Sequence, residues 1–143
     1  MSHSFNKIWI HAIWATKERR PRLSVEIEAR VYALITDELK ESGCPPIIIN
    51  GMPDHVHALF LLNPKKSISE VMKQIKGASS YQINQSNLMS EKFAWQTGYA
   101  AYSVSESAKQ KVIDYIKNQK SHHAKRTFQE EYEDFIRLYG LNT

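Results

Sequence analysis

Residues 54–62 read DHVHALFLL, a short run in which two histidines precede a stretch of apolar residues. Side chains alternate between the two faces of a β-strand, so His55 and His57 share one face while Val56 and Ala58 point to the other. Beyond the histidines both faces are apolar, which predicts a strand that is covered on both sides. A sheet built around such a strand needs helices on each face.

The flanking sequence contains three further candidate strands and four candidate helices. Residues 8–15 (IWIHAIWA) are β-branched, aromatic and apolar on both faces, which favours a second buried strand. Two more strands are expected at 47–49 and within 93–104. Capping and periodicity signals predict helices from Ser24 to Gly43, from Ser67 with Glu70 as a capping box toward Ile83, over about 106–120, and over 128–139.

The predicted order is β-α-β-β-α-β followed by two helices. This order is typical of an α+β protein with a ferredoxin-like, split βαβ antiparallel sheet, in which the first and third strands are central. The C-terminal helices are then the candidates to cover the second face of the sheet. A length of 143 residues without a linker or repeat predicts a single domain over residues 1–143.

Composition narrows the class of protein without identifying it. The net charge of +4 is only a mild preference for polyanionic partners. The lone cysteine, Cys44, cannot form an internal disulfide. The apolar runs are too short to span a membrane, and the N-terminus lacks the apolar region of a signal peptide. We therefore expect a cytoplasmic protein with no membrane partner, and we expect no nucleotide cofactor.

The histidine pair is a candidate metal site. Two imidazoles spaced two residues apart on one strand face can reach the same ion. The alternative is a pair of histidines at a strand end with no ligand, and His-x-His alone does not decide between the two. A metal site here needs a third ligand.

The helix predicted over 106–120 contains a candidate ligand and a candidate nucleophile. Tyr115 and Gln119 are four residues apart, so a continuous helix places them on one face. Gln119 falls on the apolar side, where an amide without a partner costs a few kcal/mol. A tyrosine, with an ordinary pKa of about 10, needs a cation or base nearby to act as a nucleophile. The alternative is a core tyrosine beside a glutamine that is bonded to the backbone.

Four motifs in sequence order extend this pattern: Thr16-Lys17-x-Arg19-Arg20-Pro21, Pro53-Asp54-His55-Val56-His57, Ile75-Lys76-Gly77 with Ser79-Ser80, and Tyr115-Ile116-x-x-Gln119. In these motifs the chain resembles the single-tyrosine transposases of the HUH endonuclease superfamily, which serve small bacterial insertion sequences, and their REP-associated relatives. The resemblance covers nearly the whole chain. The histidine pair together with Tyr-x-x-x-Gln is what makes it specific.

The resemblance implies an enzyme that transposes single-stranded DNA. It implies His55, His57 and Gln119 as ligands of Mg²⁺ or Mn²⁺, and Tyr115 as the nucleophile that forms a 5′-phosphotyrosine intermediate. It further implies that DNA is nicked and rejoined at ends flanked by hairpins. The expected assembly is a homodimer in which the tyrosine helix of one subunit serves the histidine pair of the other.

Basic and aromatic side chains are candidates for DNA contacts. The basic set could bind hairpin phosphates, with a solvated charged surface as the alternative: Lys17, Arg19, Arg20, Arg22, Lys73 and Lys76. Trp95, Tyr99 and Tyr102 either stack on unpaired bases or, as we favour, pack in the core or at a dimer interface. His11 lies among apolar neighbours and is predicted to be a satisfied core histidine.

Other functions fit parts of the pattern. A non-catalytic or domesticated protein that binds hairpins or single-stranded nucleic acid has the same fold, and ferredoxin-like sheets also bind single-stranded RNA. A metallohydrolase of small phosphate esters needs a general base, and Asp54 is the one carboxylate next to the histidine pair in sequence.

Overall fold

The computed structural model describes residues 4–123 and the separate positions 130, 133 and 137. Four strands form one sheet in the order β2-β3-β1-β4, and every neighbouring pair is antiparallel. The strands are β1 (Trp9–Ala15), β2 (Pro46–Met52), β3 (His55–Leu61) and β4 (Ala100–Val104). The helices are α1 (Val25–Glu41), α2 (Ile68–Gln85), α3 (Lys109–Lys117) and α4 (Gln119–His123), with short 3-10 turns η1 (Lys17–Arg19) and η2 (Glu106–Ala108).

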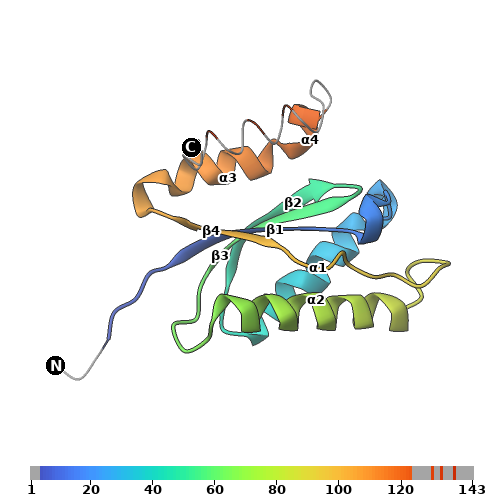
Figure 1. Cartoon of the computed structure of the whole chain (residues 1–143), viewed down its shortest axis with the longest axis horizontal. Helices are drawn as coiled ribbons and strands as arrows, with labels where there is room; N and C mark the ends of the chain where they lie inside the picture. The colour runs from blue at the N-terminus through green and yellow to red at the C-terminus, as the bar shows by residue number, and fades with distance from the viewer. Residues whose placement is uncertain (1–3, 124–129, 131–132, 134–136, 138–143) are drawn as a thin grey trace.

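The sheet is the middle layer of three, as Figure 1 shows: α1 and α2 lie on one side and α3 and α4 on the other. This arrangement confirms the predicted α+β, split βαβ fold with β1 and β3 at the centre. The described residues include no helix that is both long and apolar enough to cross a lipid bilayer.

Alternation along the central strands assigns each residue to one of two cores. Ile10 and Trp14 of β1 and Val56 and Phe60 of β3 pack with α1 and α2. The opposite faces of the same strands pack Trp9 and Leu59 against Val112 and Ile116 of α3. His55 and His57 lie on the same face of β3 as Leu59, so the fold directs both histidines toward α3 and α4.

A tight hairpin joins β2 to β3 and positions the histidine pair. Its register places Asn50 opposite His57 and Met52 opposite His55, with Pro53 and Asp54 in the turn. A Cβ atom at position 51 would collide with the carbonyl oxygen of His55. Gly51 therefore permits the close approach of the two strands beside the candidate site.

The predicted capping box of α2 is present. Ser67 Oγ accepts a hydrogen bond from the backbone N–H of Glu70 at 3.1 Å, and Glu70 Oε1 accepts one from the N–H of Ser67 at 3.1 Å. Gly77 does not interrupt this helix, which continues to Gln85. The α1 helix ends just before Gly43, which adopts the left-handed φ of +74°.

The segment predicted as one helix over 106–120 differs from the expectation. It consists of η2, α3 and α4, with a break at Asn118 (φ −96°, ψ 17°). Asn50 stabilises the end of α3 at this break, because its Nδ2 donates to the carbonyl oxygens of Ile116 at 3.0 Å and Lys117 at 3.2 Å. Gln119 thus begins a new helix rather than continuing that of Tyr115.

Two other expectations concern the ends of the C-terminal half. The fourth strand, β4, lies within the predicted range 93–104 and occupies its last part. Phe93 and Trp95 pack in the core beside α2, and Trp95 also forms an isolated β-bridge with Thr16. Of the final helix predicted over 128–139, Glu130, Glu133 and Arg137 are helical, and the other positions lie outside the described residues.

Candidate active site

The histidine pair lies at the start of β3, buried beneath the C-terminal helices. His55 is 4% exposed and His57 is 2% exposed. Their ring centroids are 5.1 Å apart, with an angle of 70° between the ring planes. The strand therefore brings both imidazoles to one small volume, as the sequence predicted.

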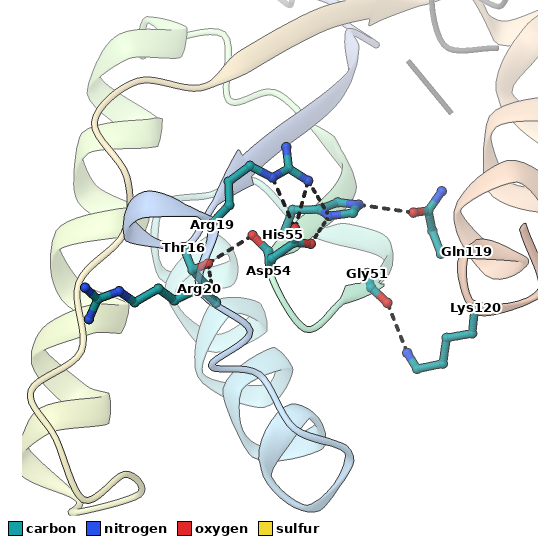
Figure 2. A network of polar contacts seen from close by, with 8 residues as sticks. All are labelled: Thr16, Arg19, Arg20, Gly51, Asp54, His55, Gln119 and Lys120. Carbon is teal, nitrogen blue, oxygen red and sulfur yellow. Dashed lines mark hydrogen bonds and ion pairs between the residues drawn. The ribbon is translucent and has the colours of Figure 1, made fainter. Parts of the chain in front are cut away.

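Gln119 faces this pair from the start of α4. Its Oε1 lies 3.4 Å from the Nε2 of His55, as drawn in Figure 2. The side chain is fully buried, and its Nε2 has no hydrogen-bond partner among the described residues. The predicted proximity of Gln119 to the histidines is thus observed, although the helix break changes how it arises.

Asp54 orients His55 from the other side. Its Oδ1 is 2.7 Å from the Nδ1 of His55, which leaves the Nε2 of that ring directed toward Gln119. Burial raises the pKa of Asp54, but hydrogen bonding and charge from His55 and Arg19 outweigh it, so the net pKa lies below the ordinary value. An ionised carboxylate accepts hydrogen bonds only, so the Nδ1 of His55 carries its hydrogen.

Arg19 completes this polar group. Its Nε and Nη2 donate to Oδ2 of Asp54 at 3.1 and 3.0 Å. Both Arg19 and the preceding Glu18 have positive φ, 54° and 57°, in the left-handed region that non-glycine residues seldom adopt. Such backbone strain persists where surrounding contacts hold it, and here it directs the guanidinium into the site.

Tyr115 reaches the pair from α3. Its ring is half-buried and meets the ring of His57 edge-on, with centroids 5.7 Å apart. His11 lies beside both, at 6.2 Å from Tyr115 by centroids.

His11 is a core histidine, as predicted, but its partner was not foreseen. It is fully buried, and its Nε2 lies 2.9 Å from the Nδ1 of His57. Burial, and to a lesser extent His57, lowers the pKa of His11 well below its usual value, which keeps the ring neutral. Pairing of the two central strands places His11 opposite Leu59, and Leu59 lies on the same face of β3 as His57. The alternating pattern of both strands, taken together, was the signal that could have placed His11 beside His57.

A cavity of about 310 Å³ opens beside these groups. Arg19, His55, His57 and Tyr115 line one part of it, and the remainder is mostly apolar, from β1, the 96–100 segment and β4. Tyr99 and Tyr102 contribute to that wall. Trp95, by contrast, is buried in the α1–α2 core, where its Nε1 donates to Ser79 Oγ at 2.9 Å.

The predicted DNA-contacting cations fall into different environments. Lys17 and Lys73 are exposed. Arg20 forms an exposed ion pair with Glu18 at 3.0 Å, and Figure 2 shows its guanidinium directed away from His55. Together with Lys92, Lys17 and Arg20 line a second cavity of about 380 Å³.

Arg22 and Lys76 are engaged with the backbone of their own chain. Arg22 donates to the carbonyl oxygens of Glu91 at 2.9 Å and Lys92 at 3.3 Å. The Nζ of Lys76 donates to those of Gln96 at 2.7 Å and Gly98 at 2.6 Å, and burial lowers its pKa. Lys76 thus fixes the segment that forms one wall of the cavity beside the histidine pair.

Asn50 and Lys120 fasten the C-terminal helices to the sheet, and neither contact was predicted. The Nζ of Lys120 lies 3.0 Å from Asn50 Oδ1, 3.1 Å from the carbonyl oxygen of Gly51 and 3.1 Å from Glu28 Oε2. Since Asn50 itself caps α3, the two residues set the position of α4 and hence of Gln119. The useful sequence signal was a polar residue at the end of the apolar run 47–49.

The donor atoms fit a hard divalent cation. Two imidazole nitrogens and an amide oxygen converge here, and carboxylate or phosphate oxygens can complete such a set. In the described part of the chain no three histidine, cysteine, aspartate or glutamate side chains are grouped to hold an ion. Gln119, whose amide oxygen lies beside His55, can therefore serve as a third protein ligand to such an ion.

Comparison with solved structures places this fold among the transposases. A crystal structure of a transposase from Deinococcus radiodurans R1 superimposes with a TM-score of 0.66 at 27% identity, covering 83% of this chain and 95% of that one. A REP-associated tyrosine transposase, solved bound to a REP hairpin, superimposes with a TM-score of 0.62 at 15% identity, covering 86% and 74%. The second likeness concerns the fold alone.

Sequence comparison assigns the family. The profile described as "Transposase IS200 like" matches residues 4–119, from the N-terminal segment to Gln119. The ISDra2 transposase TnpA of Deinococcus radiodurans is 30% identical over 114 residues, which cover 76% of this chain and 81% of that protein. The chain belongs to the IS200-like transposase family.

Proposed function

We propose that this transposase cuts and rejoins single-stranded DNA at hairpin-flanked ends through a 5′-phosphotyrosine intermediate. The observation that carries the proposal is the convergence of Tyr115, His55 and His57 on one cavity, with Gln119 beside His55. Family membership supports transposition, and the REP-associated relative is described as bound to a REP hairpin.

The residues divide the chemistry between them. His55, His57 and Gln119 would hold Mg²⁺ or Mn²⁺, which when bound polarises the phosphate under attack. The phenolic oxygen of Tyr115 forms a bond to phosphorus, and the bond from phosphorus to the 3′ oxygen breaks. Tyr115 loses its proton, and the departing 3′ oxygen gains one. The ester retains the energy of the broken bond, so a 3′-hydroxyl can reverse the step without ATP.

The surroundings of the site suit an unpaired strand. Tyr99 is 41% exposed at the cavity, and aromatic faces stack on bases that are not paired. The exposed cations Lys17, Arg20 and Lys73 can contact phosphates of the strand outside the cavity. Arg19 brings positive charge to the cavity that Tyr115 also lines, and Asp54 neutralises part of this charge.

We also propose a homodimer in which the tyrosine helix of one subunit serves the histidine pair of the other. Tyr115 and Gln119 lie on helices that follow the last strand, so the same helices of a second subunit can occupy this position against the sheet. A mixture of His55→Ala and Tyr115→Phe proteins tests the exchange. Recovery of nicking activity in the mixture supports it, and an inactive mixture of folded dimers contradicts it.

The central experiment is a covalent-product assay. Purified protein is incubated with Mn²⁺ and labelled single-stranded DNA carrying the hairpins that flank its gene, followed by a denaturing gel. We expect a labelled band at the mass of protein plus DNA, lost with EDTA and in Tyr115→Phe. Tyr81→Phe is the matched control, because Tyr81 is 61% exposed on α2, on the other side of the sheet.

A non-catalytic hairpin-binding protein is the alternative. It predicts a shifted native complex with no covalent product across several metals and flanking sequences. Absence of both products and complexes would instead direct attention to small phosphate esters as substrates.

A further inference from the structure

His11 has no role in the function proposed above, yet it is fully buried against a candidate metal ligand. We infer that His11 is a positioning residue that fixes the tautomer and ring orientation of His57, so that the Nε2 of His57 faces the metal. The inference rests on the proposed function to the extent that His57 is a ligand.

The geometry of the contact defines two possible hydrogen placements. His11 Nε2 and His57 Nδ1 are 2.9 Å apart, with ring centroids 5.1 Å apart. A neutral imidazole has one donor and one acceptor nitrogen, so one ring must donate and the other accept. If His57 donates from Nδ1, its Nε2 keeps a lone pair for a cation. If His11 donates, the Nε2 of His57 carries the hydrogen and cannot bind a metal.

The neighbouring histidine indicates which placement the site uses. His55 is held at Nδ1 by the Asp54 carboxylate, with 2.7 Å between the atoms, and directs its Nε2 toward Gln119. His57 repeats the first part of this pattern, because its Nδ1 is also bound by a neighbouring side chain, that of His11. Metal-binding histidines generally donate their second N–H to such a partner, which sets the tautomer and raises the basicity of the ligand.

The choice of histidine rather than a carboxylate as the partner has an electrostatic reason. Asp54 already brings one negative charge to the site, and half-exposed Arg19 balances it. His11 is completely enclosed, where an unbalanced second carboxylate would be costly. A neutral imidazole supplies the acceptor without adding charge.

His11 also packs beside Tyr115 of its own chain. The rings of His11, His57 and Tyr115 contact one another in a triangle, with centroid separations of 5.1, 5.7 and 6.2 Å. A change at position 11 therefore alters both the orientation of His57 and the packing of the Tyr115 ring. A purely structural role would alter packing but not the tautomer of His57.

The decisive measurement needs neither metal nor DNA. Metal-free protein with ¹⁵N-labelled histidine is studied by long-range ¹⁵N–¹H correlation spectra, with His57 assigned by comparison with His57→Ala. We expect His57 in the Nδ1–H tautomer. The Nε2–H tautomer in the wild-type protein would overturn the inference, whatever the variants do.

Three variants separate positioning from packing. His11→Phe keeps the ring and removes the acceptor, while His11→Gln restores an acceptor oxygen at similar reach. Ile10→Val is the control, because Ile10 is the adjacent buried residue on the opposite face of β1. We expect the Nδ1–H tautomer to be retained in His11→Gln and Ile10→Val and to be lost or mixed in His11→Phe.

Metal affinity gives the second readout. Titration of free Mn²⁺ by electron paramagnetic resonance should show binding about 10–100-fold weaker in His11→Phe, the usual effect of removing such a partner, with recovery in His11→Gln. Unchanged affinity in a folded His11→Phe protein contradicts the inference. If that variant does not fold, the wild-type spectrum and the glutamine variant decide. Wild-type Mn²⁺ binding with no covalent DNA product would remove the proposed function and leave the role of His11 standing.

Discussion

Asp54 and His55 are neighbours in the chain whose side chains also bind each other, with 2.7 Å between Oδ1 and Nδ1. The hairpin makes this possible, because Asp54 ends the turn and His55 begins the strand. Arg19 binds the second oxygen of the same carboxylate at 3.0 Å. The candidate ligand is therefore oriented by a group that is itself held in place.

Removing the charge of Asp54 should weaken metal binding. In Asp54→Asn the amide oxygen still accepts from His55, but the bond is no longer charge-assisted and Arg19 loses its ion pair. We expect Mn²⁺ affinity to fall by about 10–100-fold in calorimetric titration. Asp37→Asn, at an exposed position on α1, is the control. Equal affinities in the two variants would show that Asp54 does not orient a ligand.

Asn50 should be important for stability. Its side chain satisfies the terminal carbonyl groups of Ile116 and Lys117 and receives a hydrogen bond from Lys120. Asn50→Ala leaves these groups without their partner, at a cost of about 1–3 kcal/mol in the free energy of unfolding measured with urea. The exposed substitution Asn6→Ala should change it by less than about 0.5 kcal/mol. An unchanged stability of Asn50→Ala would mean that packing and the contacts of Lys120 with Gly51 and Glu28 are sufficient to hold α3 and α4.

Lys73 and Lys76 lie one turn apart on α2 and should respond differently to salt. Each phosphate contact on single-stranded DNA contributes about 0.7 to the slope of log affinity against log salt. Lys73→Met should reduce this slope by about that amount, because Lys73 is exposed. Lys76→Met should weaken binding through the 96–98 segment and leave the slope unchanged, because its ammonium is bound to Gln96 and Gly98. A lower slope in Lys76→Met would identify a direct phosphate contact instead.

Glu106 should make the stability of the folded protein depend on pH in the acidic range. Hydrogen bonds from Trp9 and Lys7, with a smaller effect from Lys109, lower its pKa from 4.5 to about 2. A carboxyl group with a lowered folded-state pKa stabilises the protein above its unfolded-state pKa, and this contribution disappears as pH falls through the folded-state value. The difference in thermal unfolding temperature between wild type and Glu106→Gln should therefore shrink from about pH 4.5 to about 2. A difference that stays constant over this range would exclude the effect.

The sequence was sufficient for the sheet because its signals are local. Two-residue alternation in 8–15 and 55–62 located both central strands, and Ser67 with Glu70 located the start of α2. The break at Asn118 could not be foreseen, since its cause, Asn50, is 66 residues from Ile116 in the chain. Helix propensities of the residues around Asn118 contain no information about a capping side chain on a distant strand.

The site was predictable where residues share an element and less so where they meet across elements. His55 and His57 share one strand face, and the structure places Gln119 and Tyr115 beside them. The contact between His11 and His57 depends on the register of two strands, which alternation within either strand leaves open. Lys76 shows the same limit, because the sequence does not distinguish a lysine that binds distant carbonyl groups of its own chain from one that contacts DNA.

The alternation in β3 places Val56 and Phe60 in one core and His55 and His57 in the site. The register of this one strand therefore determines both the core packing and the position of the candidate ligands. A register slip of one residue would move the histidines into the core beneath α1 and α2 and carry core residues to the cavity. Insertions or deletions in this strand should consequently abolish folding and chemistry together. Variants of the family that lose activity but remain folded are therefore expected to do so by substitution, or by changes beyond the sheet, rather than by length changes in β3.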